Sequence, residues 1–384
     1  MGSCLSCKYA GGSKTRNPPC QPVLKEVASE DPSCVSSHSD KNSNKNSRTS
    51  QHSLSANDGP KRPTSGLETG RGREKKLSIC STYSDRPLHD LPSEVPEDNA
   101  LTVHDFYNII NDGALNPYIH EDGNFLIIDC RSEEVFSKLH VITARHFAEL
   151  KTDSKFMSGL GYSLYNIVII YGNGFKKADS EHLVNMWREI SLNVAGDVLV
   201  LSEGFDQFKE RFSFMCTKNM VNTIWERKNI LTYPSVVING KLYQGKGEQA
   251  TSVRVVKDLK ITHIVNITKE HPNAFPDKIS YLKLPIDDER ASNLLKHFEE
   301  TSEFMEAAFK MKGVVLVHCN LGVSRSSSVV LAYLMKSQQI SLEKALQFLK
   351  SRRSCARPNI GFLTQLSQWE LKILGEKVTC VDSL

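Results

Sequence analysis

A short segment places a thiol, a glycine and a guanidinium at the spacing that phosphate chemistry requires. The pattern His-Cys-x-x-Gly-x-x-Arg is formed by His318, Cys319, Gly322 and Arg325. A cysteine at a helix N-terminus and beside an arginine ionises more readily, so it can attack phosphorus at neutral pH. An arginine binds two phosphate oxygens and stabilises the charge of the transition state. The pattern therefore predicts a phosphate-cleaving site with Cys319 as the nucleophile and Arg325 as the clamp.

The flanking residues predict the elements that position this loop. The β-branched run at 314–317 predicts a buried strand, and SSSVVLAYLM (326–335) has apolar residues at helical spacing. A loop between a strand and a helix N-terminus directs backbone N–H groups at an anion, and the helix dipole adds positive potential. We expect the phosphate to be bound by the residues that follow the nucleophile: Asn320, Leu321, Gly322, Val323, Ser324 and Arg325.

Further residues complete the predicted chemistry. Ser326 can donate a hydrogen bond to the thiolate when it leaves a phosphocysteine, and His318 is expected to order the loop rather than transfer a proton. The leaving oxygen needs a proton, and Asp287 and Asp288 lie on a predicted loop upstream of the nucleophile. We assign Asp288 as the acid, with Asp287 as the alternative. A second interpretation is that these carboxylates cap a helix that begins near Ala291.

By these residues, the segment 226–376 resembles the dual-specificity protein phosphatases. The shared stretches are LKITHIVNITKE (259–270), the PIDD loop, HCNLGVSRSS and ARPNIGFLTQLSQWE (356–370). The resemblance implies an α/β catalytic domain with a pocket shallow enough for phosphotyrosine, phosphothreonine and phosphoserine. It also implies that Pro358 and Asn359 steady the phosphate loop. Gln365 and Leu366 should pack below that loop from the last helix.

An earlier segment, 96–220, predicts a second α/β domain. Helical spacing in LTVHDFYNIIND (101–112) is followed by three apolar strand runs and, between the last two, the helical stretch KADSEHLVNMWREI (177–190). Strands that alternate with helices predict a parallel sheet covered on both faces. The predicted strands are 125–131, 166–174 and 197–205.

Within this segment, IIDCRSEEVFSKLHVITARH resembles the rhodanese-like domain through Asp129, Arg131, Phe136, His140 and Ala144. Active members carry a catalytic cysteine directly after the next core strand, where this chain has Gly172. Sulfur transfer is therefore not expected, and Cys130, within the earlier strand, is interpreted as a small core residue. Related domains bind MAP kinases through an arginine cluster, but only Arg145 follows HVITA here. We expect the rhodanese-like segment to bind a protein partner, and we do not expect it to dock a MAP kinase through such a cluster.

Across residues 96–380 the chain is similar to the serine/threonine/tyrosine-interacting-like proteins. The shared stretches include HVITA, YPSVVINGKLYQGK and QLSQWELKILGEKVT. The type members of that branch are pseudophosphatases that lack the His-Cys pair, whereas His318 and Cys319 are both present in this sequence. The sequence favours an active protein phosphatase in signalling, and the alternative is a catalytically silent scaffold that binds phosphoproteins. Hydrolysis of lipid phosphates ranks last, because the variable loop positions carry no basic residue.

The first 95 residues predict a disordered tail, because they are rich in Ser, Asn, Lys, Pro and Gly and sparse in apolar residues. Met-Gly-Ser-Cys-Leu-Ser fits the pattern for N-myristoylation at Gly2. Cys4 and Cys7 are candidates for palmitoylation, which would supply the second acyl chain that stable anchoring needs. The alternative is that Gly2 merely begins a flexible tail. A short C-terminal tail is expected at 377–384.

The composition limits the remaining classes of function. The chain has 384 residues and a formal charge of only +4, which is too small to indicate a nucleic-acid partner. No run of 18 apolar residues predicts a membrane span, and no apolar secretory signal is present. We expect a cytoplasmic protein, peripheral on a membrane where it is acylated. The ten cysteines complete no zinc-binding pattern, so no metal or cofactor is expected.

Overall fold

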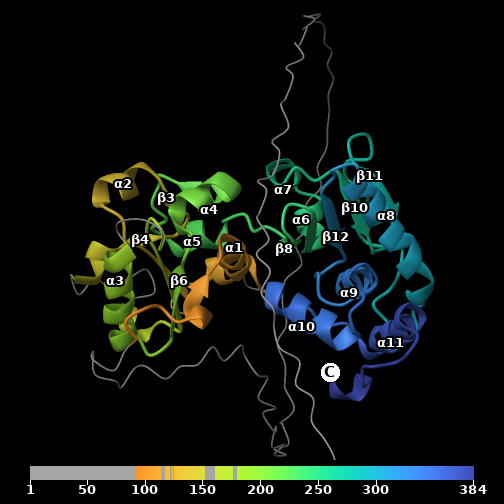
Figure 1. Ribbon diagram of the computed structural model, residues 1–384. Helices are drawn as coiled ribbons and strands as arrows, with labels where there is room; N and C mark the ends of the chain where they lie inside the picture. Colours follow the sequence, from red (N-terminus) through yellow and green to blue (C-terminus); the bar gives the residue numbers. More distant parts are fainter. Residues whose placement is uncertain (1–91, 114–116, 122, 124, 152–160, 176–179) are drawn as a thin grey trace, which may run out of the picture. The chain divides into compact units, whose positions relative to one another are not determined.

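The computed structural model describes residues 92–384 except 114–116, 122, 124, 152–160 and 176–179 (Figure 1). The predicted disordered tail and its lipidation candidates, Gly2, Cys4 and Cys7, therefore lie outside the described residues. The described part contains two five-stranded sheets and one short two-stranded sheet. None of the helices in this part is long and apolar enough to cross a bilayer.

The first five-stranded sheet is entirely parallel, as predicted from the alternation of strands and helices. Its order is β1-β6-β5-β2-β4. All five residues of β2 are buried, because helices cover both faces of the sheet. The bounds of the strands, in sheet order, are Ala100–Leu101, Asp197–Leu201, Ile167–Tyr171, Phe125–Asp129 and Arg145–His146.

Alternating residues of these strands pack against different helices. Ile127 of β2 belongs to the apolar cluster formed with α1 and α4, whereas Leu126 and Ile128 belong to the cluster formed with α3. Figure 1 shows α3 and α1 on opposite sides of the sheet. Such two-sided burial explains why the strand sequences are continuously apolar rather than alternating. The helices of this domain are α1 (Val103–Asn111), α2 (Glu133–Lys138), α3 (Ser180–Asn193) and α4 (Gly204–Phe212).

The predicted elements of this domain are present, with shorter strands than expected. β2 ends at Asp129, so Cys130 follows the strand instead of lying within it, which corrects the placement expected from sequence. The strands predicted at 166–174 and 197–205 are β5 and β6, which end at Tyr171 and Leu201. Further short elements are β3 (His140–Val141), which pairs antiparallel with β7 (Cys216–Thr217), and α5 (Ile224–Lys228).

The second five-stranded sheet has the order β11-β10-β12-β9-β8. The first four strands are parallel to their neighbours, and β8 joins the edge antiparallel to β9. The β-branched run predicted as a strand forms β12, which occupies the centre of the sheet and is buried throughout. The bounds in sheet order are Ser280–Lys283, His263–Asn266, Val315–His318, Leu242–Gly245 and Ser235–Ile238.

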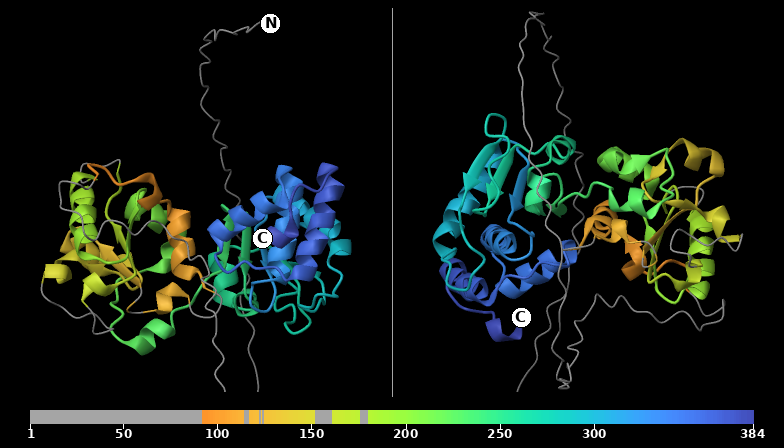
Figure 2. Two further views of the ribbon diagram at one scale, coloured as in Figure 1. Left: turned by 90° about the horizontal axis from the view of Figure 1, so that it is seen from below. Right: turned by 180° about the vertical axis from the view of Figure 1, so that it is seen from behind.

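Helix α9 is the core of this second domain. It begins directly after the predicted phosphate loop, and its first eleven residues are buried. The surrounding helices α8, α10 and α11 pack against it on one face of the sheet, whereas residues of α6 and α7 join the apolar cluster on the other face. Figures 1 and 2 show α9 enclosed by its neighbours. The bounds are α6 (Gly247–Ala250), α7 (Val253–Asp258), α8 (Phe298–Lys310), α9 (Arg325–Gln338), α10 (Leu342–Arg352) and α11 (Ile360–Leu374).

Candidate active site

The loop from β12 to α9 folds around the thiol of Cys319. This residue is only 1% exposed, and its Sγ accepts a hydrogen bond from the Gly322 N–H at 3.2 Å. Ser326 Oγ lies 3.3 Å from the same sulfur. Gly322 has a φ of +71°, and a Cβ there would lie 2.6 Å from the carbonyl oxygen of Gly245. Only glycine fits this turn, which aims its N–H at the nucleophile.

Arg325 opens α9 beside this loop and is 4% exposed. One terminal nitrogen donates to the carbonyl of Ile286 at 2.9 Å and approaches Glu270 at 3.5 Å. Its Nε is buried and has no hydrogen-bond partner within the described residues. A buried donor without a partner is costly, and a phosphate held in the loop would supply the missing acceptor. The guanidinium is therefore placed to bind an anion.

The structure brings Asp288, and not Asp287, to the phosphate loop. Asp288 Oδ1 accepts hydrogen bonds from the hydroxyl of Ser324 at 2.6 Å and the amide of Asn359 at 2.9 Å. Its other oxygen lies 3.7 Å from Nε of Arg325. Asp287 instead forms an exposed ion pair with Lys269. This geometry favours Asp288 for proton transfer at the loop.

The interpretation of these carboxylates as helix caps is wrong. The helix expected near Ala291 begins at Phe298, with His297 as its N-cap and a single 3-10 turn before it. Gln365 explains in part why the helix begins later than expected. Its Oε1 accepts from the N–H groups of Leu294 and Leu295, and its Nε2 donates to the carbonyl of Ser292. Gln365 thus holds the segment after Asp288, instead of packing below the phosphate loop as the resemblance implied.

His318 is buried at the end of β12, 1% exposed. Burial lowers its pKa to about 4, so the ring is neutral at pH 7. Its Nδ1 lies 3.2 Å from the carbonyl oxygen of Cys319, and a neutral ring can donate to that oxygen. The pKa and the contact favour the predicted role of ordering the loop over proton transfer.

Asn359 connects three parts of the site. As the N-cap of α11 it accepts a hydrogen bond from the N–H of Phe362 at 3.0 Å. Its own backbone N–H donates to Ser324 Oγ at 3.1 Å, while its side-chain amide donates to Asp288. The supporting role expected for Asn359 therefore extends from the phosphate loop to the candidate acid.

Comparison with known proteins finds a family match for each of the two predicted domains. Residues 242–372 match the dual specificity phosphatase catalytic domain, and residues 113–211 match the rhodanese-like domain. The chain contains a rhodanese-like domain followed by a dual specificity phosphatase domain. The matched residues lie inside the predicted limits of 96–220 and 226–376, whose ends remain predictions.

Individual relatives match parts of the chain. A "Probable rhodanese domain-containing dual specificity protein phosphatase" of Dictyostelium discoideum is 38% identical over 175 residues, 45% of this chain and 37% of the relative. Human dual specificity protein phosphatase 5 is 33% identical over 178 residues, 46% of this chain and 46% of the relative. The crystal structure of human DUSP28 is 34% identical with a TM-score of 0.35, covering 37% of this chain and 96% of that one. The chain spans well under half of the length of the first three curated relatives (37%, 19% and 36%).

Two buried residues of the phosphatase domain escaped the sequence analysis. Gln244 lies on β9 and is 0% exposed, and its amide reaches Gly322 and Ser326. Arg353 follows α10, is 1% exposed, and donates to the carbonyls of Gly322 at 2.8 Å and Leu321 at 3.4 Å and to a serine of β8. A glutamine inside an apolar strand is a signal that could have been noticed. The arginine lies in the basic run SRRSC, where sequence gives no reason to expect burial.

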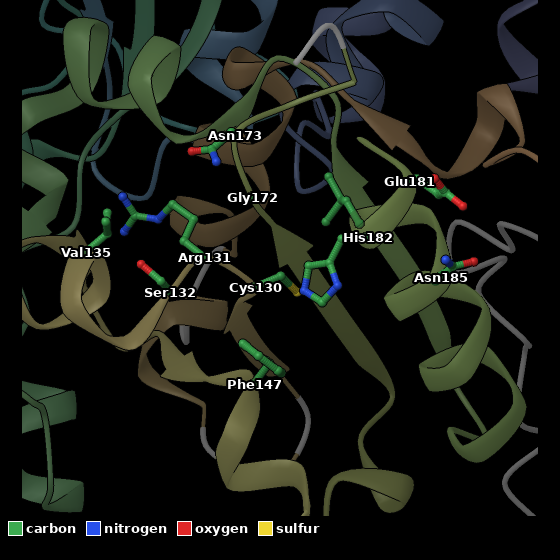
Figure 3. Close-up of a pocket in the computed structure, with 11 residues that line it drawn as sticks. Cys130, Arg131, Ser132, Val135, Phe147, Gly172, Asn173, Glu181, His182 and Asn185 are labelled. Atoms are coloured by element: carbon green, nitrogen blue, oxygen red, sulfur yellow. The ribbon is translucent and has the colours of Figure 1, made fainter. Parts of the chain in front are cut away.

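The rhodanese-like domain has a pocket where its active relatives would place a catalytic cysteine. The pocket has a volume of about 690 Å³ and lies at the carboxyl ends of β2 and β5 (Figure 3). Gly172 follows β5 there, as the sequence indicated. Cys130, which also lines the pocket, is buried, and burial raises the pKa of its thiol. Arg131 is held by a 2.6 Å ion pair with Asp129 and lies over the ring of Phe205. With Gly172 at one strand end and a buried thiol of raised pKa at the other, the described residues of the pocket include no readily ionised thiol.

Proposed function

We propose that this chain is a cysteine-dependent protein phosphatase that hydrolyses phosphotyrosine and phosphoserine or phosphothreonine through a phosphocysteine. The observation that carries the proposal is the buried Nε of Arg325 beside the Cys319 loop, which has no hydrogen-bond partner in the described part of the chain and lies 3.7 Å from Asp288. A cradle with a nucleophile, an anion clamp and a carboxyl group fits phosphoryl transfer. The domain match supports the same class of reaction.

In the first step, the Cys319 thiolate attacks phosphorus while the bond from phosphorus to the substrate oxygen breaks. The loop N–H groups and the guanidinium of Arg325 stabilise the charge on the phosphoryl oxygens. Asp288 gives its proton to the leaving oxygen. The products of this step are the dephosphorylated protein and a phosphocysteine.

In the second step, water attacks phosphorus and transfers a proton to the carboxylate of Asp288. The sulfur–phosphorus bond breaks, and its electron pair returns to Cys319. Ser326, 3.3 Å from the sulfur, stabilises the thiolate as it leaves. Inorganic phosphate is released and the enzyme returns to its starting state, so the two steps balance with the groups named here.

The test is steady-state hydrolysis of an aryl phosphate by the full chain under reducing conditions, followed by phosphotyrosine and phosphothreonine peptides. Cys319→Ser is expected to abolish turnover. On the phosphothreonine peptide, Asp288→Asn should lower turnover by about 10²-fold or more, the usual contribution of a positioned acid. Phosphopeptide binding by Cys319→Ser without turnover by the folded wild type would favour the alternative function, a phosphoprotein-binding scaffold.

We further propose that the acylated N-terminus keeps this phosphatase at a cytoplasmic membrane surface. Gly2 would carry myristate and Cys4 and Cys7 would carry palmitate, since a single acyl chain binds membranes weakly. Clickable myristate should label the wild type expressed in cells and not Gly2→Ala; equal labelling of both would end this part of the proposal. The rhodanese-like domain would bind a protein partner and not transfer sulfur, because Gly172 occupies the position of the catalytic cysteine.

A further inference from the structure

A glutamine beneath the phosphate loop contacts one residue of the loop and two residues of the helix that follows it. Gln244 is fully buried on β9, next to the central strand β12. Its Nε2 lies 3.2 Å from the carbonyl oxygen of Gly322, 3.2 Å from Ser326 Oγ and 2.7 Å from Ser327 Oγ. Its Oε1 is buried with no hydrogen-bond partner among the described residues.

The neighbours of this amide determine which end is the nitrogen. The carbonyl oxygen of Gly322 can only accept, so the atom that faces it must be the NH₂ group. Ser327 does not compete as a donor, because its hydroxyl donates to the carbonyl of Val323 at 2.7 Å. An inverted amide would place two carbonyl oxygens about 3.2 Å apart, as the distance to Gly322 shows. The orientation with Nε2 toward the loop leaves Oε1 unsatisfied, which indicates that the loop contacts outweigh this cost.

This orientation fixes the direction of the Ser326 hydroxyl. Among the described residues, Ser326 Oγ has two polar neighbours at hydrogen-bond distance, Nε2 of Gln244 and Sγ of Cys319. The nitrogen of a primary amide donates and does not accept. The hydrogen of Ser326 must therefore point to the sulfur.

We propose that Gln244 is a positioning residue that directs the Ser326 hydroxyl at Cys319 and thereby accelerates hydrolysis of the phosphocysteine. The inference rests on the proposed phosphatase function. When the sulfur–phosphorus bond breaks, the electron pair stays on sulfur, and the thiolate then accepts from both the Gly322 N–H and the Ser326 hydroxyl. Water supplies the new oxygen–phosphorus bond, and its proton goes to Asp288. Without Gln244 the serine hydroxyl is free to rotate away from the leaving thiolate.

The first measurement is rapid-quench kinetics of the full chain with an aryl phosphate. The initial burst of phenol reports formation of the phosphocysteine, and the steady state that follows reports its hydrolysis. Gln244→Leu should retain the burst and slow the steady state by about tenfold, since a hydrogen bond to a charged group contributes roughly that factor. Ser326→Ala should slow it by at least as much.

The double variant decides between positioning and general packing. If Gln244 acts through Ser326, Gln244→Leu combined with Ser326→Ala is no slower in the steady state than Ser326→Ala alone. Multiplied losses would overturn the proposal, as would a Gln244→Leu variant that loses the burst and the steady state in equal proportion. Gln244→Met, which keeps the chain length and removes the donor, should reproduce the kinetics of Gln244→Leu and serves where the leucine variant does not fold.

A second readout does not depend on turnover. Iodoacetamide alkylation of the Cys319 peptide, followed by mass spectrometry across a pH series, reports how readily the sulfur ionises. Gln244→Leu should move the alkylation midpoint to higher pH, and should have no effect in the Ser326→Ala background. A wild type without turnover would refute the proposed function, while this alkylation series would still test the positioning role. An identical midpoint in Gln244→Leu and wild type would overturn the role.

Discussion

Asn359 offers a way to separate the stability of the phosphatase domain from the positioning of its acid. Its Oδ1 caps α11, while its Nδ2 donates to Asp288. Serine caps helices about as well as asparagine but has no amide that could reach the carboxylate. Asn359→Ser should therefore keep the cap and lose the contact with Asp288, whereas Asn359→Ala should lose both.

The expected magnitudes follow from the two contacts. Loss of an N-cap costs about 1 kcal/mol, so Asn359→Ala should lower the melting midpoint of the phosphatase domain by about 3 °C. Asn359→Ser keeps the cap and should melt above Asn359→Ala. The contact with Asp288 is charge-assisted, but the carboxylate side chain is 35% exposed, so water replaces part of it. We therefore expect the loss of this contact to raise the activation free energy by about 1 kcal/mol, which is about fivefold in rate.

Two substrates make the assay specific for the acid. The threonine oxygen of a phosphothreonine peptide would leave as an alkoxide, so it needs a proton from the acid. The leaving group of an electron-poor aryl phosphate is stable as an anion and hardly needs that proton. Both Asn359 variants should lose about fivefold in kcat/KM on the peptide and little on the aryl phosphate. Equal losses on both substrates would refute the argument, because they would locate the defect in the phosphate loop. An unaffected Asn359→Ser would refute it as well.

Three more variants test the support of the loop. Arg353→Met should weaken inhibition by vanadate about tenfold, because two loop carbonyls lose a charge-assisted donor; unchanged inhibition would show that the loop does not need it. Gly322→Ala should abolish turnover and weaken vanadate binding, since its φ of +71° and the 2.6 Å approach to Gly245 leave no room for a methyl group. Because burial lowers the pKa of His318 to about 4, its contribution to stability is complete above pH 6.5 and is lost as the pH falls toward 4. Between pH 7 and 4.5 the wild type should therefore lose about 2–3 kcal/mol more stability than His318→Gln, measured by denaturant titration; equal losses would contradict the burial argument.

The sequence predicted the parts of the fold that local patterns determine. β12 is recognisable because a β-branched apolar run precedes the loop, and α9 because apolar residues recur at helical spacing. In the rhodanese-like domain, the strands were overestimated in length, since apolar or small residues continue past β2 and β5 into the loops at the pocket. Periodicity describes how side chains alternate, and it does not say where backbone pairing ends.

The choice between the two aspartates could not be completed from sequence. Asp287 and Asp288 are adjacent and chemically identical, and only their partners separate them: an exposed lysine for one, and Ser324 with Asn359 for the other. Those partners lie 36 and 71 positions away from Asp288. The cap interpretation failed for the same reason, because Gln365 on α11 engages the backbone that follows the loop. Long-range hydrogen bonds decide both questions.

The two peptide groups that flank Gly322 show how far the signature loop depends on residues outside it. The Gly322 N–H reaches the nucleophile, while the Gly322 carbonyl accepts from Arg353 and Gln244, which are 31 and 78 positions away in the chain. The plane that carries the Gly322 N–H also carries the carbonyl of Leu321, which accepts from Arg353 at 3.4 Å. A plane held at this carbonyl has its N–H direction fixed as well, because the two groups are rigidly opposed. The donor that faces the sulfur is therefore oriented by the segment after α10, and Gln244 of β9 and Arg353 hold the peptide plane that follows it, before any phosphate arrives. Preorganised donors of this kind need no reorganisation during the reaction. An intact His-Cys-x-x-Gly-x-x-Arg pattern is thus necessary for this geometry but does not produce it alone, and substitutions at Gln244 or Arg353 should impair the loop while leaving the pattern unchanged.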